Sequence, residues 1–232
     1  MIQYKSILGI CIVFISITHL CAQNDAEGYL LGVSGKLKKV NDYSVQANIK
    51  VDMPFIRILP TDVKIYYKQK DKFKVETKGI AIVPRQGFDQ ISTVLADKSS
   101  YTAMIQGQET IGNTSTTIVN VIPLSDTSDL ILAKLWIDPI KSVIIKSQLT
   151  TKSSGTILTE YFYGNQVDYG LPDKMIFTVD SKKFKMPKNI GADPNKSDTK
   201  KNNNKENKKG KIYIEFTNYQ VNKGISDAVF KK

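Results

Sequence analysis

The sequence predicts a mainly β (α+β) fold, an incomplete antiparallel β-barrel of about ten strands that two or three short helices cover. Three observations support this fold class. Apolar and polar residues alternate along many short segments, turn-forming residues separate these segments, and two other stretches place apolar residues at helical spacing. Strands with one apolar side belong in an antiparallel sheet whose other face meets water. Such a sheet, when strongly curved, has a concave apolar face for helices to cover.

The alternation predicts where each strand lies. In the first strand, polar residues separate five apolar residues, which therefore share one face: Val45, Ala47, Ile49, Val51 and Met53. The same pattern predicts strands over 63–67, 73–77, 117–121, 130–137, 144–149, 157–163, 175–179 and 212–216. Turn residues between these segments predict short hairpin links, so strands adjacent in sequence are expected to be adjacent in the sheet.

Two segments are expected to be helices. Residues 25–40 carry apolar side chains at helical spacing, although each of the three glycines in this segment costs about 1 kcal/mol relative to alanine. Residues 86–97 place Phe88, Ile91 and Leu95 on one side of a short amphipathic helix. Both helices have an apolar stripe that could cover the concave face of the sheet.

The first 22 residues have the pattern of a cleavable export signal. A segment with one lysine precedes an apolar run, and cleavage is expected after Ala22. The run is too short for a transmembrane anchor, which needs about 20 apolar residues. Lipidation of Cys21 is the other alternative, although such signals favour a small residue where this chain has Leu20. The mature chain, residues 23–232, is expected to be a single periplasmic domain.

Residues 182–210 are rich in lysine and asparagine. Between residues 182 and 211, eleven lysines accompany three acidic residues, so most of the net charge of +11 lies here. With few apolar residues to bury, this stretch is expected to be a disordered insertion between two strands. A polybasic contact with anionic lipid headgroups is the functional alternative. Nucleic acid is not an expected partner, because the export signal directs the chain to the wrong compartment.

The reactive side chains are distributed in a way that argues against catalysis. The single histidine, His19, and both cysteines, Cys11 and Cys21, lie in the expected export signal. A mature chain without them has no Ser-His-Asp or Cys-His site and no usual zinc or copper site, so no enzyme activity, metal or cofactor is expected. A carboxylate-pair hydrolase stays an alternative, although the acidic residues are scattered over turns and polar strand faces.

Several segments of the chain carry a family resemblance when they are taken together. They are the export signal, the N-terminal helix, residues 63–75, the strand end over 135–139 and the C-terminal stretch 216–230. In these segments the sequence resembles the LolA/LolB/LppX superfamily of lipoprotein and lipid carriers, and the resemblance covers most of the mature chain. It implies an incomplete β-barrel capped by helices, with an apolar cavity that takes up acyl chains.

The residues expected to line this cavity come from the concave face of the sheet and from the second helix. Plain core packing is the alternative for each of them. The candidates are Val45, Ala47, Ile49, Val51, Val63, Ile65, Tyr67, Phe73, Phe88, Ile91, Leu95 and Trp136.

The resemblance also implies a latch for the helical lid. In the periplasmic carrier of this superfamily, an arginine in one strand pair is associated with holding the lid closed. The matching position here resembles Gln69, which supplies no fixed charge. Arg85, beside the second expected helix, is the other candidate, although a solvated charge at a helix start is its plainer interpretation.

For function, the resemblance implies a periplasmic carrier that binds acyl chains of lipoproteins or lipids and moves them toward the outer membrane. Burial of an acyl chain is worth about 0.8 kcal/mol per methylene relative to water, but almost nothing relative to a bilayer. The expected partners are those acyl chains and, transiently, membrane-bound donor and acceptor proteins that meet a monomeric carrier. The alternative is a non-enzymatic envelope sensor or scaffold that binds a lipoprotein or another envelope protein through the same open barrel.

Overall fold

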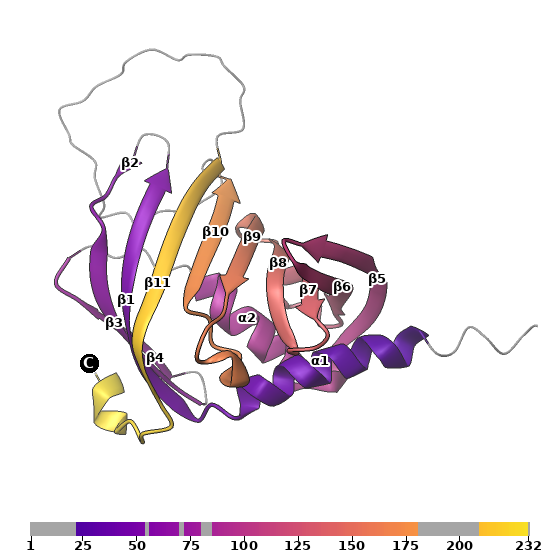
Figure 1. Ribbon diagram of the computed structural model, residues 1–232, viewed down its shortest axis with the longest axis horizontal. Coiled ribbons are helices and arrows are strands. Elements are labelled where there is room, and N and C mark those ends of the chain that lie inside the picture. Colours follow the sequence, from indigo (N-terminus) through magenta and orange to yellow (C-terminus); the bar gives the residue numbers. More distant parts are fainter. Residues whose placement is uncertain (1–21, 54–55, 70–71, 80–84, 181–208, 232) are drawn as a thin grey trace, which may run out of the picture.

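The computed structural model describes residues 22–53, 56–69, 72–79, 85–180 and 209–231 (Figure 1). The side chains of residues 22–25, 56–57, 85–90 and 180 lie outside this description. Of the expected export signal and the expected insertion, residues 1–21 and 182–208 also fall outside the described residues, whereas Ala22 begins α1 and residues 209–210 begin β11.

One antiparallel sheet dominates the fold. Its spatial order is β4-β3-β1-β11-β10-β9-β8-β7-β6-β5, and β2 pairs with β1 beside this path. The ends of this order, β4 and β5, do not join, so the sheet is an open barrel, as predicted. The strands are β1 (Asp42–Met53), β2 (Ile56–Arg57), β3 (Thr61–Lys68), β4 (Lys72–Thr77), β5 (Tyr101–Ile111), β6 (Thr114–Pro123), β7 (Leu130–Asp138), β8 (Val143–Thr151), β9 (Gly155–Phe162), β10 (Lys174–Asp180) and β11 (Lys209–Val221).

Two α-helices accompany the sheet, close to the ranges predicted for them. Helix α1 (Ala22–Lys38) packs against β5, β8 and α2 (Arg85–Ala96), and in Figure 1 it runs beside the end where the sheet curls. The described residues also form the short 3₁₀ helices η2 (Lys98–Ser100), η3 (Val167–Tyr169) and η4 (Asp227–Phe230). No helix in the described part of the chain has the length and apolar character to cross a membrane.

The inward side chains of the sheet form two hydrophobic clusters. The first, here called the β1 cluster, joins β1, β3, β9, β10 and β11, and includes the five alternating residues predicted for β1. The second, here called the helix cluster, joins β5 to β8 with the apolar stripes of α1 and α2. Tyr161 on β9 packs against both clusters and so marks their boundary.

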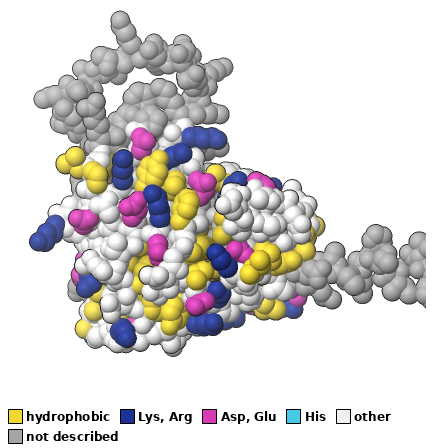
Figure 2. All heavy atoms as spheres, viewed as in Figure 1, with side chains coloured by type: hydrophobic (Ala, Val, Ile, Leu, Met, Phe, Trp, Pro, Cys, Tyr) yellow, Lys and Arg dark blue, Asp and Glu magenta, His cyan; other side chains and the backbone are white. Residues whose placement is uncertain are grey.

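The outward face of the sheet is charged and polar. Figure 2 shows lysine and acidic side chains interspersed with hydrophobic ones on the visible face. Lys174 of β10 and Glu215 of β11, which are register partners, form an ion pair of 2.8 Å across this face. The predicted alternation of a dry and a wet face therefore describes this part of the sheet correctly.

Polar contacts hold the C-terminal end of α1. Gln69 donates its side-chain amide to the carbonyl of Val40 at 3.0 Å. The Asn222 amide donates to the carbonyl of Lys39 at 2.8 Å, while its carbonyl oxygen accepts the backbone N–H of Asn41 at 2.7 Å. These side chains satisfy backbone groups just beyond the helix end, which a helix terminus needs.

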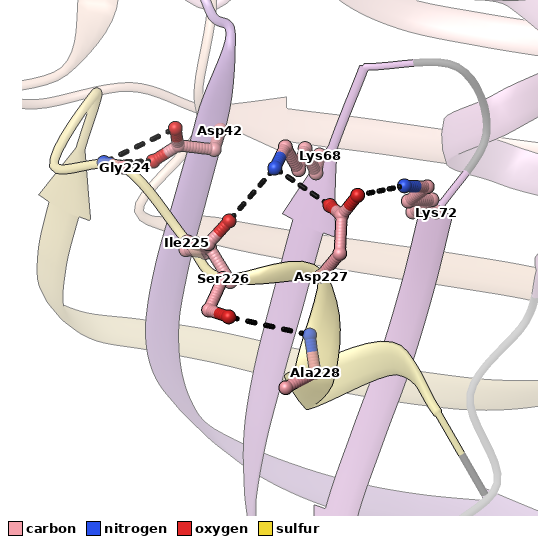
Figure 3. Close-up of polar contacts among 8 residues, drawn as sticks. All are labelled: Asp42, Lys68, Lys72, Gly224, Ile225, Ser226, Asp227 and Ala228. Carbon is pink, nitrogen blue, oxygen red and sulfur yellow. Dashed lines mark hydrogen bonds and ion pairs between the residues drawn. The ribbon is translucent and has the colours of Figure 1, made fainter.

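The C-terminal segment is tied to the hairpin of β3 and β4, which carries Gln69 between its strands (Figure 3). The Asp227 carboxylate contacts Lys68 at 2.7 Å and Lys72 at 2.9 Å, and Lys68 also donates to the carbonyl of Ile225 at 2.9 Å. Hydrogen bonds from Lys68 and then Lys72 lower the pKa of Asp227 to about 2. The C-terminus thereby braces the hairpin that contacts the end of α1.

Acid is expected to release this C-terminal segment. Because the pKa of Asp227 is lower in the folded state than the usual value of about 3.9, its contribution is present above pH 4 and is lost as the pH falls toward 2. We expect the protection of the Ala228 and Val229 amides from hydrogen exchange, measured relative to the intrinsic rate at each pH, to fall over that window. Asp227→Asn should show this low protection already at pH 7, whereas Asp168→Asn, at a more exposed carboxylate, should not. Equal exchange rates in wild type and Asp227→Asn at pH 7 would contradict the assignment.

Candidate functional site

A pocket of about 70 Å³ lies between the two α-helices and the curled half of the sheet. Most of its wall is apolar, and it opens beside α1. Its lining residues come from α1, α2, the turn before β8, β8, β9 and the loop after η3: Val33, Leu37, Ile91, Ser92, Ser142, Val143, Ile144, Tyr161, Tyr163, Gly170, Leu171 and Pro172.

Two glycines allow α1 to approach the pocket wall closely. A Cβ atom at Gly32 would lie 2.9 Å from the hydroxyl oxygen of Ser142, so α1 approaches the turn before β8 closely and a side chain here would displace Ser142. Gly170 has a φ of +67°, which glycine adopts without strain, and it turns the loop after η3 against Leu37. The pocket lies between these two points of contact.

Two tyrosines bring polar atoms to the pocket. The Tyr161 hydroxyl hydrogen-bonds the Ser147 hydroxyl at 3.0 Å, and the Tyr163 hydroxyl donates to the carbonyl of Ile144 at 2.9 Å. Burial raises the pKa of Tyr161 to about 12 and the pKa of Tyr163 well above its usual value, so both are neutral hydrogen-bonding groups at physiological pH. Both rings nevertheless keep some accessible surface, because the pocket opens onto them.

Among the predicted cavity residues whose side chains the structure describes, only Ile91 borders this pocket. Leu95 lies one helical turn further along α2 and is buried in the helix cluster. Phe88 and Arg85 belong to α2, but their side chains lie outside the described part of the structure.

The predicted residues of β1, β3 and β4 lie together in the β1 cluster, away from the pocket. Tyr67 and Phe73 are only partly buried there, whereas Val45, Ala47, Ile49, Val51, Val63 and Ile65 are buried. Ala47 and Val63 also border a wider, more polar hollow of about 1400 Å³ beside β3 and β4. The structure brings these eight residues together, and their role as a lipid-binding wall stays a prediction.

Trp136 lies on the opposite face of the sheet, so its prediction as a cavity residue is wrong. The helix cluster takes Ala133, Leu135 and Ile137 from β7, which places the intervening Trp136 outward. Its indole N–H donates to Glu109 at 2.6 Å, and Lys134 and Lys146 lie 4.9 and 4.4 Å from its ring centroid. The indole is buried by its neighbours on the outer face rather than by the pocket.

The uncharged side chain of Gln69 hydrogen-bonds backbone carbonyls at the C-terminal end of α1. Besides its bond to Val40, its amide lies 3.4 Å from the carbonyl of Lys38, the last residue of α1. The role of Gln69 in closing a lid stays a prediction.

Sequence reasoning missed most of the pocket wall. Leu37 stood on the predicted apolar stripe of α1, and Tyr161 and Tyr163 lay in a predicted strand, but nothing in the sequence indicated that these residues meet. Leu171 and Pro172 follow η3, which the sequence presents only as a turn. Their position depends on how the loop folds back against α1.

The chemistry that this pocket supports is apolar binding with a few neutral hydroxyl groups. Within the described part of the chain, no charged side chain lines the pocket, and no group of three histidine, cysteine or acidic side chains could hold a metal ion. Such a pocket suits an apolar group that carries at most a neutral polar atom.

The open sheet with helices against its curled half is an architecture that solved structures share. A LolA superfamily protein from Nitrosomonas europaea matches with a TM-score of 0.57 over 89% of this chain and 97% of that one, at 10% identity. A DUF1329 family protein from Desulfovibrio piger matches with a TM-score of 0.53 over 88% and 96%, at 13% identity. No family model and no curated protein sequence matches the chain. The fold is therefore that of the LolA superfamily, as the resemblance implied.

Proposed function

We propose that this protein is a non-enzymatic carrier that binds acyl chains of lipoproteins or lipids and moves them toward the outer membrane. The observation that carries the proposal is the apolar pocket between α1, α2 and the sheet, with hydrophobic clusters on both sides of it. The LolA-type fold supports the same function, because the resemblance to the LolA/LolB/LppX superfamily implies a carrier of lipoproteins or lipids.

Energetics favour exchange over storage in such a pocket. Each buried methylene contributes about 0.8 kcal/mol relative to water, so an acyl chain does not leave into solvent. A bilayer offers the chain an equally apolar environment, and transfer to it costs little. The carrier therefore needs no chemistry or energy source of its own.

The pocket must widen to accept a full acyl chain. Its volume of about 70 Å³ is far below the roughly 300–1,000 Å³ of pockets that enclose drug-sized ligands. Helices α1 and α2 contact one another, and both contribute apolar residues to the wall. Separation of the two helices from the sheet is the motion that the proposal requires.

The proposal includes a cellular setting. The expected export signal would deliver a monomeric chain to the periplasm, where it meets membrane-bound donor and acceptor proteins transiently. A native mass spectrum of the protein purified from envelope extracts should show adducts with the mass of acylated molecules. Protein without adducts that also fails to keep a lipopeptide soluble would overturn the carrier function.

Leu37→Glu is expected to weaken binding of a fluorescent acyl chain at least tenfold. Leu37 borders the pocket, and a carboxylate there is either desolvated or protonated when the ligand enters, at a cost of several kcal/mol. Leu31→Glu is the matched control, because Leu31 lies on the same helix with 53% of its surface exposed. Titration of both variants with the fluorescent chain tests the site. Equal affinity of Leu37→Glu and wild type would place the ligand elsewhere.

A further inference from the structure

The inner face of the sheet contains two hydroxyl groups in a row of apolar side chains. Ser147 on β8 and Thr159 on β9 are register partners, and both are fully buried. The row runs across the strands from the helix cluster to the β1 cluster, and Ser147 and Thr159 lie where the two clusters meet. Its other members, in spatial order from β5 to β1, are all apolar: Ile105, Val119, Leu135, Phe177, Ile212 and Val51.

The Thr159 hydroxyl is buried on the inner face without a hydrogen-bond partner among the described residues. Its oxygen is inaccessible and has no hydrogen-bond partner of acceptable geometry among the described residues. Buried polar groups are nearly always hydrogen-bonded, so an unpaired one calls for an explanation. A valine of the same shape would fill this position without that cost.

Ser147 and Thr159 connect to the pocket through Tyr161. The Tyr161 hydroxyl bonds the Ser147 hydroxyl at 3.0 Å, and Ser147 is the register partner of Thr159. Tyr161 itself borders the pocket. An acyl chain in the pocket therefore contacts Tyr161, whose hydroxyl is bonded to the buried Ser147.

The three hydroxyl groups carry more protons than they can use among themselves. Even when three hydroxyls bond in a chain, two bonds consume two of the three protons. When Ser147 donates to Tyr161, the Tyr161 proton is left for another acceptor. The strongest acceptor of an acyl chain is its carbonyl oxygen, which is neutral and needs no charged partner.

We propose that Ser147, Thr159 and Tyr161 form a polar subsite that hydrogen-bonds the carbonyl group of a bound acyl chain. This inference rests on the proposed carrier function and adds a ligand class to it. The subsite selects acylated molecules over plain hydrocarbon or ether-linked chains. It also fixes the depth of the chain, because the carbonyl lies beside Tyr161 and the methylenes extend along the apolar face.

A matched pair of ligands tests the carbonyl directly. Acyl lysophosphatidylcholine and its 1-O-alkyl analogue, with 14-carbon chains, differ only in the carbonyl group, and calorimetric titration below their micelle concentration gives both dissociation constants. We expect the acyl form to bind about 3- to 10-fold more tightly, which is the contribution of one net hydrogen bond. Equal affinity for the two ligands overturns the subsite but leaves the carrier function standing. Binding of neither ligand overturns both.

Three variants locate the preference. Thr159→Val, Ser147→Ala and Tyr161→Phe should each bring the acyl-to-alkyl ratio toward 1 while affinity for the alkyl form stays within about twofold. Thr156→Val, at an exposed threonine of the same strand, is the control and should keep the ratio of the wild type. Thr159→Val is shape-conserving, and its urea unfolding midpoint reports whether the fold is intact. A folded Thr159→Val protein that retains the full preference, or loses affinity for both ligands equally, overturns the role of that hydroxyl.

Discussion

Replacement of Phe177 by alanine is expected to lower the free energy of unfolding by about 3–5 kcal/mol. Phe177 is fully buried on β10, between Thr159 and Ile212 on the inner face. Removal of its ring loses apolar burial and leaves a cavity that neighbouring strands, fixed in one sheet, fill only in part. Urea unfolding followed by circular dichroism measures the loss.

Phe162→Ala provides the matched control for this prediction. Phe162 ends the neighbouring strand β9, and 48% of its surface is exposed. Its removal should cost less than about 1 kcal/mol, since surface positions tolerate substitution. Similar losses for the two phenylalanines would mean that the inner face of β10 is not the packed core described here.

Replacement of Trp136 by alanine is expected to cost about 3 kcal/mol, near the lower end of the range for buried aromatic residues. The indole loses its hydrogen bond to Glu109 and its contacts with Lys134 and Lys146. These neighbours lie on the outer face, where water and flexible lysine side chains fill part of the space. Denaturant unfolding again measures the loss.

A ligand-binding measurement distinguishes the inner face of the sheet from the outer face. Folded Trp136→Ala protein should keep the acyl-chain affinity of the wild type, because the indole lies on the side of β7 opposite the helix cluster. Trp136→Phe is the milder control and should recover part of the lost stability. Loss of ligand affinity in a folded Trp136→Ala protein would contradict the outward placement of the indole.

Periodicity predicted the regular strands well. In β1, apolar residues at every second position indicated the buried face correctly, because unbroken pairing keeps alternate side chains on opposite faces. Strand β5 was not among the predicted strands, since its Gln106 to Thr110 segment is polar and a register shift occurs between Ile105 and Gly107. A bulge of this kind interrupts the period of two on which the prediction depends.

Trp136 shows where a local pattern fails. Three consecutive apolar residues, Leu135 to Ile137, are all buried, so burial alone does not distinguish the inner face from the outer face. The orientation of Trp136 depends on its pairing with β8, which has a register shift beside it, and on Glu109 of β5, which hydrogen-bonds the indole. Neither is visible in the local sequence of β7. The pocket has the same character, because Leu37, Tyr161 and Leu171 meet through tertiary packing that no local spacing encodes.

The glycines of α1 bear on how the pocket opens. A side chain at Gly32 would crowd Ser142, but Gly28 and Gly35 face open space, where a Cβ atom would meet nothing within 4 Å. Each glycine weakens the helix by about 1 kcal/mol relative to alanine. Packing against the sheet is therefore needed to keep α1 helical. We therefore expect α1 to lose helical structure when it leaves the sheet, so that the regained chain entropy offsets part of the lost packing. A ligand that displaces α1 therefore competes with the folding of this helix onto the sheet, and not only with the packing of a rigid helix.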